Sequence, residues 1–294
     1  MMIYKQYTTM KKQTVSLLVI LLAASGFFFS CGNTTNKNTG SLEFDSIQVN
    51  ETAHLFGDTA KPACSLTINF AYADSSTDSV LRDSLNTYFL SLCLGEKYMT
   101  MPPLEAVRQY TDDYVNGYRK DLEPIYQKDE QDNADPNDMG AWYSYYKNIE
   151  SRIQLYYKNL LVYRYYYEEY TGGAHGVYMT SFLNMDLRTL RPIHLDDIFV
   201  SDYQEALTDL LWNQLMADNN VTSRQELEDL GYTSTGDLTP TENFYLSKEG
   251  ITFFYNIYEI TPYVMGAIQI TLPWDMMLHL MSDDTMVVNE LRNS

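Results

Sequence analysis

Hydrophobic and polar residues follow each other along the chain in patterns that predict both strands and helices. Alternation with a period of two is typical of strands, whereas apolar residues spaced three and four apart are typical of amphipathic helices. The acidic stretch 128–140 has no period and predicts a solvent-exposed loop. The first pattern predicts strands at 63–72, 142–155, 161–167 and 177–187, and the second predicts helices at 78–94 and 103–122.

The C-terminal part also contains both helical and strand patterns, in shorter segments. Ser223 and Glu226 form a capping box that starts a short helix, and Pro273 stands where a terminal helix would begin. The full pattern predicts the class α+β, an antiparallel β-meander packed with amphipathic helices in two intimately joined subdomains. The remaining predicted elements are a helix at 203–215 and strands at 244–246, 251–257 and 267–272.

Tyrosine is unusually frequent, with 26 residues. Tyr163, Tyr165 and Tyr167 line one face of a predicted strand. Cross-strand aromatic pairs stabilise a meander, so these rings can be structural. Aromatic rings also stack on sugars, and a carbohydrate platform is the alternative.

The N-terminus has the layout of a secretory signal. Lys5, Lys11 and Lys12 precede the apolar run 15–29, which is too short for a typical transmembrane helix. The run ends at Ser30-Cys31, which resembles the lipobox of bacterial lipoproteins, and a plain cleaved signal is the alternative. We expect 1–30 to be a lipoprotein signal peptide, Cys31 to carry the lipid, and 31–59 to be a polar tether.

The net charge indicates which partners the chain can bind, and the residues after Cys31 indicate where it is located. The formal net charge is -19, and removal of 1–30 leaves 17 basic residues against 39 acidic ones, or -22. Such a chain is a poor nucleic-acid binder but would attract a cationic partner. In some Gram-negative lipoproteins, an acidic cluster after the lipid-bearing cysteine resembles a signal for export to the cell surface, and no such cluster follows Cys31. We therefore expect a periplasm-facing lipid anchor on the outer membrane of a Gram-negative bacterium.

The sequence contains no recognisable catalytic or metal-binding motif, and we expect neither a metal nor a cofactor. A pair of carboxylates, as glycosidases use, remains possible because acidic residues are abundant. Cys64 lies on a predicted strand and Cys93 on the apolar face of a predicted helix. Both thiols are expected in the same core, either as a disulfide or as two buried free thiols.

Two short clusters are the candidate functional segments. In the first, Gly172, Gly173 and Gly176 permit a bent backbone around His175, which either faces a ligand or locks the bend with a hydrogen bond. The second runs from Tyr258 to Gly266. Pro262 and Gly266 bracket a turn there, and Tyr263 is either an exposed anchor for a ligand or a core residue.

These two clusters, in this order, carry a family resemblance. Tyr-x-Gly-Gly-Ala-His-Gly at 170–176, Asn184-x-Asp186, and Tyr-Glu-Ile-x-Pro-Tyr-x-x-Gly at 258–266 resemble the C-terminal domain of RsiV-type lysozyme-sensing anti-sigma factors. The preceding part resembles the accessory domain of PdaC-type peptidoglycan deacetylases. The resemblance implies a PdaC-type accessory domain at 60–171, an RsiV-like domain at 172–285 and a tail at 286–294.

The resemblance implies an α+β module that binds something in the cell envelope. The catalytic domain of the deacetylases has no counterpart in this sequence. We therefore expect a non-catalytic, lipid-anchored binding module for a lysozyme-like cationic protein or for peptidoglycan, with His175, Tyr258, Pro262 and Tyr263 at the ligand. The alternatives are a hydrolase or deacetylase-type enzyme acting on peptidoglycan or another glycan, and a structural component of an outer-membrane assembly.

Overall fold

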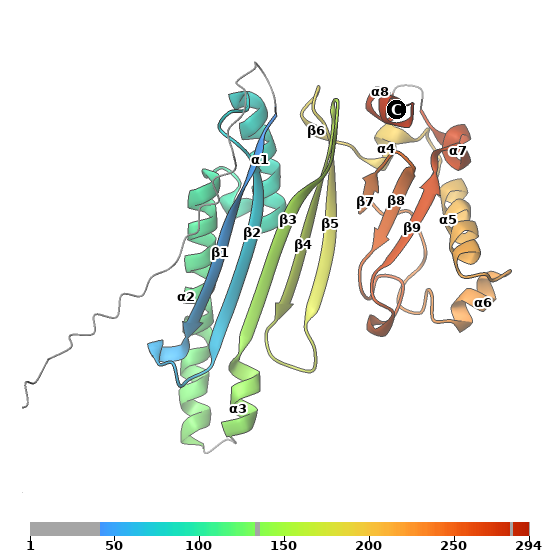
Figure 1. Ribbon diagram of the computed structural model, residues 1–294. Helices are drawn as coiled ribbons and strands as arrows, with labels where there is room; N and C mark the ends of the chain where they lie inside the picture. Colours follow the sequence, from blue (N-terminus) through green and yellow to red (C-terminus); the bar gives the residue numbers. More distant parts are fainter. Residues whose placement is uncertain (1–41, 133–135, 283–284, 294) are drawn as a thin grey trace, which may run out of the picture.

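The computed structural model describes residues 42–132, 136–282 and 285–293, and it confirms the class α+β. A six-stranded sheet with the order β1-β2-β3-β4-β5-β6 forms one lobe, and a three-stranded sheet with the order β7-β8-β9 forms the other (Figure 1). The six strands are β1 (Phe44–His54), β2 (Ala63–Ala73), β3 (Tyr145–Tyr157), β4 (Leu160–Tyr170), β5 (Val177–Asp186) and β6 (Arg191–Pro192).

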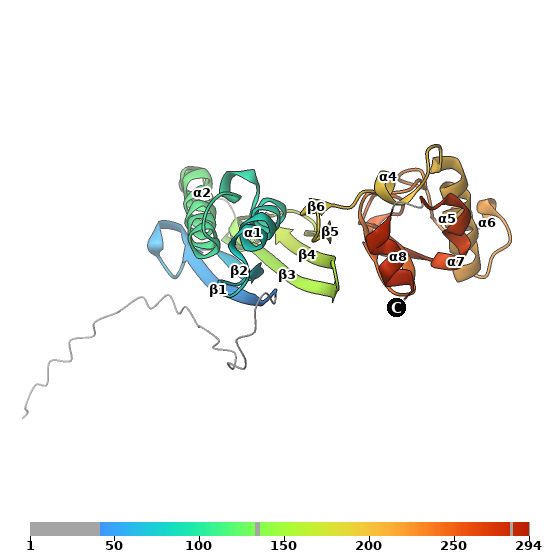
Figure 2. The same ribbon diagram turned by 90° about the horizontal axis from the view of Figure 1, so that it is seen from above.

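The larger sheet is antiparallel except between β2 and β3, which run parallel because the chain crosses over through a helical connection. Figure 2 shows α1 (Ser79–Leu94) and α2 (Pro103–Gln131) on one face of this sheet. Leu66, Ile68 and Phe70 of β2 point toward these helices and lie in a common buried cluster with Leu85 and Phe89 of α1. The short helix α3 (Pro136–Tyr143) leads from α2 into β3.

The smaller sheet is the centre of the second lobe. Its largest hydrophobic cluster includes Leu211 of a helix, Phe253 and Ile270 of the sheet, and Leu160 and Val162 of β4 from the first lobe. The core of the second lobe therefore extends onto β4 of the first lobe, which also has a core of its own beneath α1 and α2. The second lobe contains α4 (Leu195–Ile198), α5 (Gln204–Asp218), α6 (Arg224–Asp229), β7 (Phe244–Leu246), β8 (Gly250–Tyr255), β9 (Ile268–Pro273), α7 (Trp274–Met277) and α8 (Met286–Arg292).

Asparagine side chains join the outer edge of β5 to the second lobe. Asn184 donates through Nδ2 to the carbonyl of Phe244 at 2.8 Å, and its Oδ1 accepts from the backbone N–H of Leu246 at 3.0 Å. Asn243 accepts from the N–H of Phe182 at 3.1 Å and donates to the carbonyl of Thr180 at 2.9 Å. These amides satisfy the backbone groups that an edge strand would otherwise leave unpaired.

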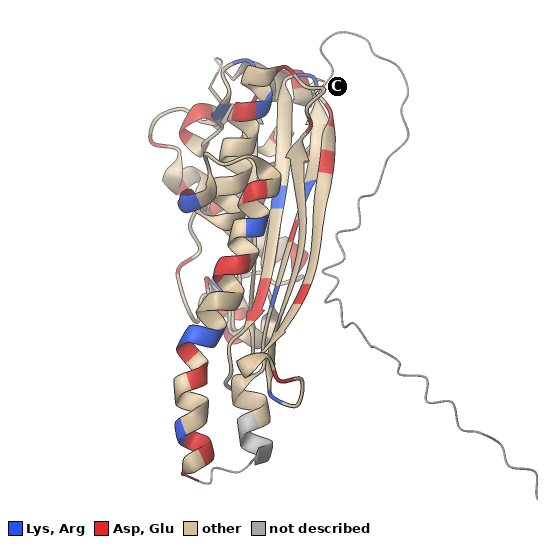
Figure 3. Ribbon diagram, turned by 90° about the vertical axis from the view of Figure 1, so that its left-hand side faces the viewer, with Lys and Arg blue, Asp and Glu red and all other residues tan. Residues whose placement is uncertain are grey.

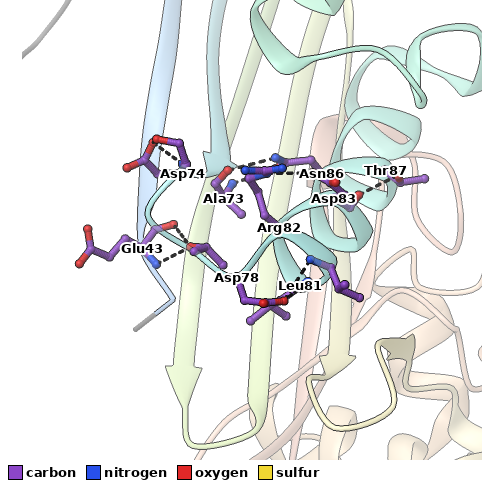
Figure 4. Close-up of polar contacts among 12 residues, drawn as sticks. Glu43, Ala73, Asp74, Asp78, Leu81, Arg82, Asp83, Asn86 and Thr87 are labelled. Carbon is purple, nitrogen blue, oxygen red and sulfur yellow. Dashed lines mark hydrogen bonds and ion pairs between the residues drawn. The ribbon is translucent and has the colours of Figure 1, made fainter. Parts of the chain in front are cut away.

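An asparagine side chain also pairs with the backbone at the end of β2. Asn86 is buried on α1, and its amide accepts from the N–H of Ala73 at 2.8 Å and donates to the carbonyl of Ala73 at 3.0 Å (Figure 4). About two turns earlier, Asp78 caps α1 by accepting from the backbone N–H groups of Val80 and Leu81. Local capping thus starts α1, and a long-range pair fixes it to the sheet.

Three parts of the predicted organisation are wrong. The expected tether 31–59 contains β1, which pairs along its whole length with β2. The expected boundary at 171/172 separates β4 from β5, yet these strands are paired within one sheet. The expected tail 286–294 is mostly α8, and Val288 and Leu291 are buried in the second lobe.

Two further differences concern α2 and its surroundings. The helix continues through Pro124 to Gln131, and α3 follows, so most of the expected loop 128–140 that the structure describes is helical. Tyr126 and Tyr143 pack edge to face with 5.0 Å between ring centroids. This tertiary contact and the surrounding cluster outweigh the helix-breaking tendency of a proline.

Candidate functional site

Two loops, one from each sheet, lie at the lower ends of their sheets in Figure 1, and their aromatic side chains are in contact. The loop after β4 carries His175, whose ring stacks on Tyr263 of the loop after β8, with 4.4 Å between centroids and 25° between planes. Tyr258 Oη lies 3.3 Å from His175 Nε2, and Tyr178 packs edge-on against Tyr263. We call His175, Tyr178, Tyr258 and Tyr263 the aromatic cluster.

The glycines of the first loop let the backbone pass close to its neighbours. Gly172 has φ +85°, and a Cβ there would lie 2.9 Å from the carbonyl oxygen of Trp142. Gly176 has an ordinary φ, but a Cβ there would lie 2.8 Å from the carbonyl oxygen of Glu169. The bend therefore depends on both the conformational freedom and the small size of these residues. Gly173 also has positive φ, +105°.

The second loop is rigid for different reasons. Pro262 precedes a single 3₁₀ turn, Tyr263–Met265, and Gly266 ends it with φ +74°. Thr261 is buried and donates from Oγ1 to the carbonyl of Gly266 at 3.3 Å. Tyr258 has φ +67°, which is strained for an aromatic residue, and its side chain is 46% exposed.

A second aromatic pair borders the aromatic cluster. Tyr146 of β3 stacks on Tyr170 of β4 at 5.9 Å, and its hydroxyl donates to Glu168 at 2.9 Å. Tyr166 donates to the same carboxylate at 3.2 Å. The hydrogen bond to Glu168 raises the pKa of Tyr146, and burial followed by the Glu168 charge raises the pKa of Tyr166 to about 12. Both phenols are therefore hydrogen-bond donors at neutral pH.

The structure brings together His175, Tyr258, Pro262 and Tyr263, which the sequence singled out, and adds Tyr146, Tyr170 and Tyr178. Along their strands, these three tyrosines alternate with residues on the opposite face of the sheet. This alternation shows that they lie beside the aromatic cluster only when the register of the strands is known. Tyr263 is half-buried and belongs to none of the described hydrophobic clusters. Tyr163, Tyr165 and Tyr167 lie on the opposite face, packed beneath α1 and α2, so their role is structural.

The cluster is equipped to stack on a ligand and to form hydrogen bonds with it. The His175 ring contacts the carbonyl of Gly176 through Nδ1 at 3.2 Å and Tyr258 through Nε2. No carboxylate of the described residues is bonded to His175. Glu259 instead accepts from the backbone N–H of Asn256 at 2.8 Å. Within the ranges that the structure describes, no three His, Cys, Asp or Glu side chains are grouped as metal ligands would be.

Cys64 and Cys93 are both buried and free, so the disulfide is not formed. They lie in different hydrophobic clusters rather than in one core, and Cys93 Sγ is 3.7 Å from the hydroxyl of Tyr163. Burial raises the pKa of Cys64 to about 11 and that of Cys93 to about 12. Both thiols therefore remain protonated and unreactive at neutral pH.

The expected signal peptide and the lipid-bearing Cys31 lie outside the described residues. None of the helices that the structure describes has the length and apolar character needed to cross a membrane.

Comparisons with known proteins place the chain in a family. Residues 196–275 match the model of a protein family of unknown function, DUF3298. A crystal structure of a member of the DUF3298 family from Bacteroides fragilis is 64% identical, with a TM-score of 0.83, over 88% of this chain and 100% of that chain. A DUF3298 family protein from Pseudomonas aeruginosa shares the fold, with 16% identity and a TM-score of 0.57 over 83% of this chain and 96% of that one. The curated proteins give no match. The identity and coverage of the Bacteroides fragilis protein show that this chain belongs to the DUF3298 family.

Proposed function

We propose that the protein is a non-catalytic binding module, held at the cell envelope by a lipid on Cys31, and that the aromatic cluster binds a cell-wall glycan. The signal-like N-terminus supports the location. The resemblance to RsiV-like and PdaC-type domains supports an envelope ligand.

The observation that carries the proposal is the stack of the exposed His175 on the half-buried Tyr263, with the exposed Tyr258 bonded to the same imidazole. Sugar rings have apolar faces that pack on aromatic rings and hydroxyls that pair with phenol and imidazole groups. Tyr258 is held exposed by a strained backbone, and strain of this kind is concentrated at functional positions.

The state of the nearby polar groups supports binding rather than catalysis. Glycoside hydrolysis uses two carboxylates placed on either side of the scissile bond. Glu168 is engaged by two tyrosine hydroxyls and Glu259 by a backbone N–H, and neither is bonded to His175. These contacts leave His175 without the orienting carboxylate that a general base commonly has.

A second candidate ligand is a lysozyme-like cationic protein. The observation in its favour is the excess of acidic over basic residues, 39 against 20, which would accelerate association with a basic partner. Such binding would weaken steeply with salt.

The test is co-sedimentation of the detergent-extracted full chain with purified peptidoglycan sacculi, alongside surface plasmon resonance on immobilised lysozyme at several salt concentrations. We expect retention by sacculi that is lost in Tyr258→Ala and kept in Val264→Ala, an exposed neighbour in the same loop. Retention on lysozyme alone, weakening with salt, would replace the glycan by the cationic protein. No binding to either would refute both.

The anchor is tested separately. Cys31→Ala should release the protein from the membrane fraction and abolish metabolic labelling with palmitate. Labelling that persists in this variant would exclude a lipid on Cys31.

A further inference from the structure

The face of the six-stranded sheet opposite α1 and α2 has two parts. Figures 2 and 3 show both helices on the other side of the sheet. Leu155, Val162 and Phe182 of this face pack against the second lobe, whereas the rest of the face, along β1 to β4, carries mostly polar side chains. The register places residues from neighbouring strands in rows across it, such as Asn50, Thr67, Asn148 and Glu168. This polar part of the face needs no apolar partner and is available to a polar ligand.

One row on this face contains two arginines directly opposite each other. Arg152 of β3 pairs in register with Arg164 of β4. Like charges at directly opposed positions of an antiparallel pair destabilise the sheet. Figure 3 shows acidic and basic residues interspersed elsewhere on the molecule, along α2 for example. The arginine pair is therefore an arrangement that folding alone does not explain.

The surroundings compensate these charges only weakly. The nearest carboxylate is that of Glu150, 3.9 Å from Arg164, and the Tyr166 ring centroid lies 5.8 Å from the same guanidinium. Burial and the neighbouring charge of Arg152 lower the pKa of Arg164. Arg152 is exposed, and within the described ranges its guanidinium has no ion-pair partner.

The pair also has a fixed position relative to the aromatic residues. Arg164 is opposite Phe182 of β5, which packs against Tyr245 and Phe254 of the second lobe. Arg152 follows Tyr146, which borders the aromatic cluster, by six positions along β3, or about 20 Å at the rise of an antiparallel strand. The side chains of Glu150 and Glu168 lie on the same face between these two points.

We propose that Arg152 and Arg164 form a binding site for an oxyanion, a carboxylate or phosphate carried by a glycan whose sugar rings lie on the aromatic cluster. This proposal rests on the proposed function and narrows its ligand to an acidic glycan. Two guanidinium groups side by side present several N–H donors to one anion, and the anion removes the repulsion between them. The polar side chains between the two sites are placed to pair with sugar hydroxyls.

The first experiment compares native sacculi with sacculi whose carboxyl groups have been amidated. The full chain is tested as wild type, Arg152→Gln, Arg164→Gln and Lys120→Gln, the last being a matched loss of one exposed positive charge on α2. We expect about tenfold weaker binding for each arginine variant and for amidated sacculi, because a hydrogen bond to a charged group contributes about this factor. Lys120→Gln should bind as the wild type does.

The folded state provides a readout that a purely structural arginine would not give. Arg152→Gln removes a repulsive contact, so its melting temperature should equal or exceed that of the wild type while its binding falls. A variant that loses binding and stability together would overturn the proposal. Equal binding of wild type and both arginine variants would overturn it as well.

A second experiment keeps this inference testable if sacculi do not bind at all. Phenylglyoxal modifies arginine, and peptide mass spectrometry reports the modification of Arg152 and Arg164 separately. Protection of the two arginines by acetate or by inorganic phosphate supports an oxyanion site, even if the ligand is not a glycan. Protection by acetate indicates a carboxylate ligand, and protection by phosphate indicates a phosphate ligand. Absence of protection by both anions refutes the site whatever the sacculi show.

Discussion

Asn256 binds the backbone of Thr180 through both ends of its side-chain amide. Its Oδ1 accepts from the Thr180 N–H at 2.8 Å, and its Nδ2 donates to the Thr180 carbonyl at 3.1 Å. The amide thus takes the place of a neighbouring strand at the edge of β5. Asn256 stands at the start of the loop that carries Tyr258, so one residue joins the lobes and positions the candidate site.

Asn256→Ala is expected to lower the free energy of unfolding by about 1–3 kcal/mol, because it leaves the buried N–H of Thr180 without a partner. Urea denaturation followed by circular dichroism measures the change. Asn50→Ala, at an exposed position of β1, is the control and should stay within about 0.5 kcal/mol of the wild type. If Asn50→Ala lowers the free energy of unfolding as much as Asn256→Ala does, the stabilising role of the Asn256–Thr180 hydrogen bonds is contradicted.

Gly172→Ala should be more destabilising than Gly173→Ala. Both positions have positive φ, but only at Gly172 does the added Cβ come within 2.9 Å of a backbone oxygen, while nothing lies within 4 Å of it at Gly173. A strained left-handed residue costs about 1–3 kcal/mol, and the clash adds to this at Gly172 alone. Differential scanning calorimetry gives the order, and equal melting temperatures for the two variants would show that the bend relaxes freely.

Local signals in the sequence were sufficient for several elements of the fold. The capping box of Ser223 and Glu226 is present, and α1 ends at Leu94 before Gly95 as predicted. Signals of this kind operate within one turn of helix, so they can be identified without knowledge of the tertiary structure.

The elements that the sequence missed depend on distant partners. β1 is an edge strand whose pairing lies entirely in β2, and α2 passes Pro124 because Tyr126 packs on Tyr143. A bulge between Ile153 and Leu155 turns Leu155 to the other face of the sheet, where it packs in the second lobe. The candidate site, too, was only partly predictable from the sequence. The loops around His175 and Tyr263 were identifiable, but their meeting with Tyr146 requires the register of three strands.

Asp186 should contribute stability at neutral pH that acid removes. Although burial opposes it, hydrogen bonds from the side chain and backbone of Arg188 keep the pKa of Asp186 below its ordinary value of 3.8. A carboxyl whose pKa is lowered by folding stabilises the folded state above the unfolded pKa, and this contribution is lost as the pH falls through the folded pKa. The stability difference between wild type and Asp186→Asn should therefore be constant from about pH 7 to pH 5 and shrink below about pH 4. Guanidinium titrations at each pH measure it. A difference that is unchanged at pH 3 would show that the carboxylate charge is not responsible.

The two thiols of the folded body should be unreactive until the protein unfolds. Cys64 and Cys93 are buried, and burial raises the pKa of both well above neutrality. Iodoacetamide at about pH 8, followed by peptide mass spectrometry, should modify neither residue in buffer and both in denaturant without reductant. Labelling in denaturant that requires prior reduction would reveal a Cys64–Cys93 disulfide and contradict the structure.

Tyr263→Ala should reduce ligand binding strongly while the fold remains intact. Tyr263 is half-buried against His175 and Tyr178 but lies outside the described hydrophobic clusters, so its removal disturbs the aromatic cluster more than any core. Truncation of an aromatic anchor commonly costs about 2 kcal/mol of binding free energy, or about a thirtyfold rise in Kd. Co-sedimentation with sacculi gives the affinity, and the melting temperature gives the effect on the fold. Tyr263→Phe separates the two contributions of the side chain: because stacking on His175 needs only the ring, this variant should retain most of the binding. If Tyr263→Ala unfolds, Tyr263 is a core residue. If this variant folds and binds as the wild type does, the aromatic cluster is not part of the binding surface.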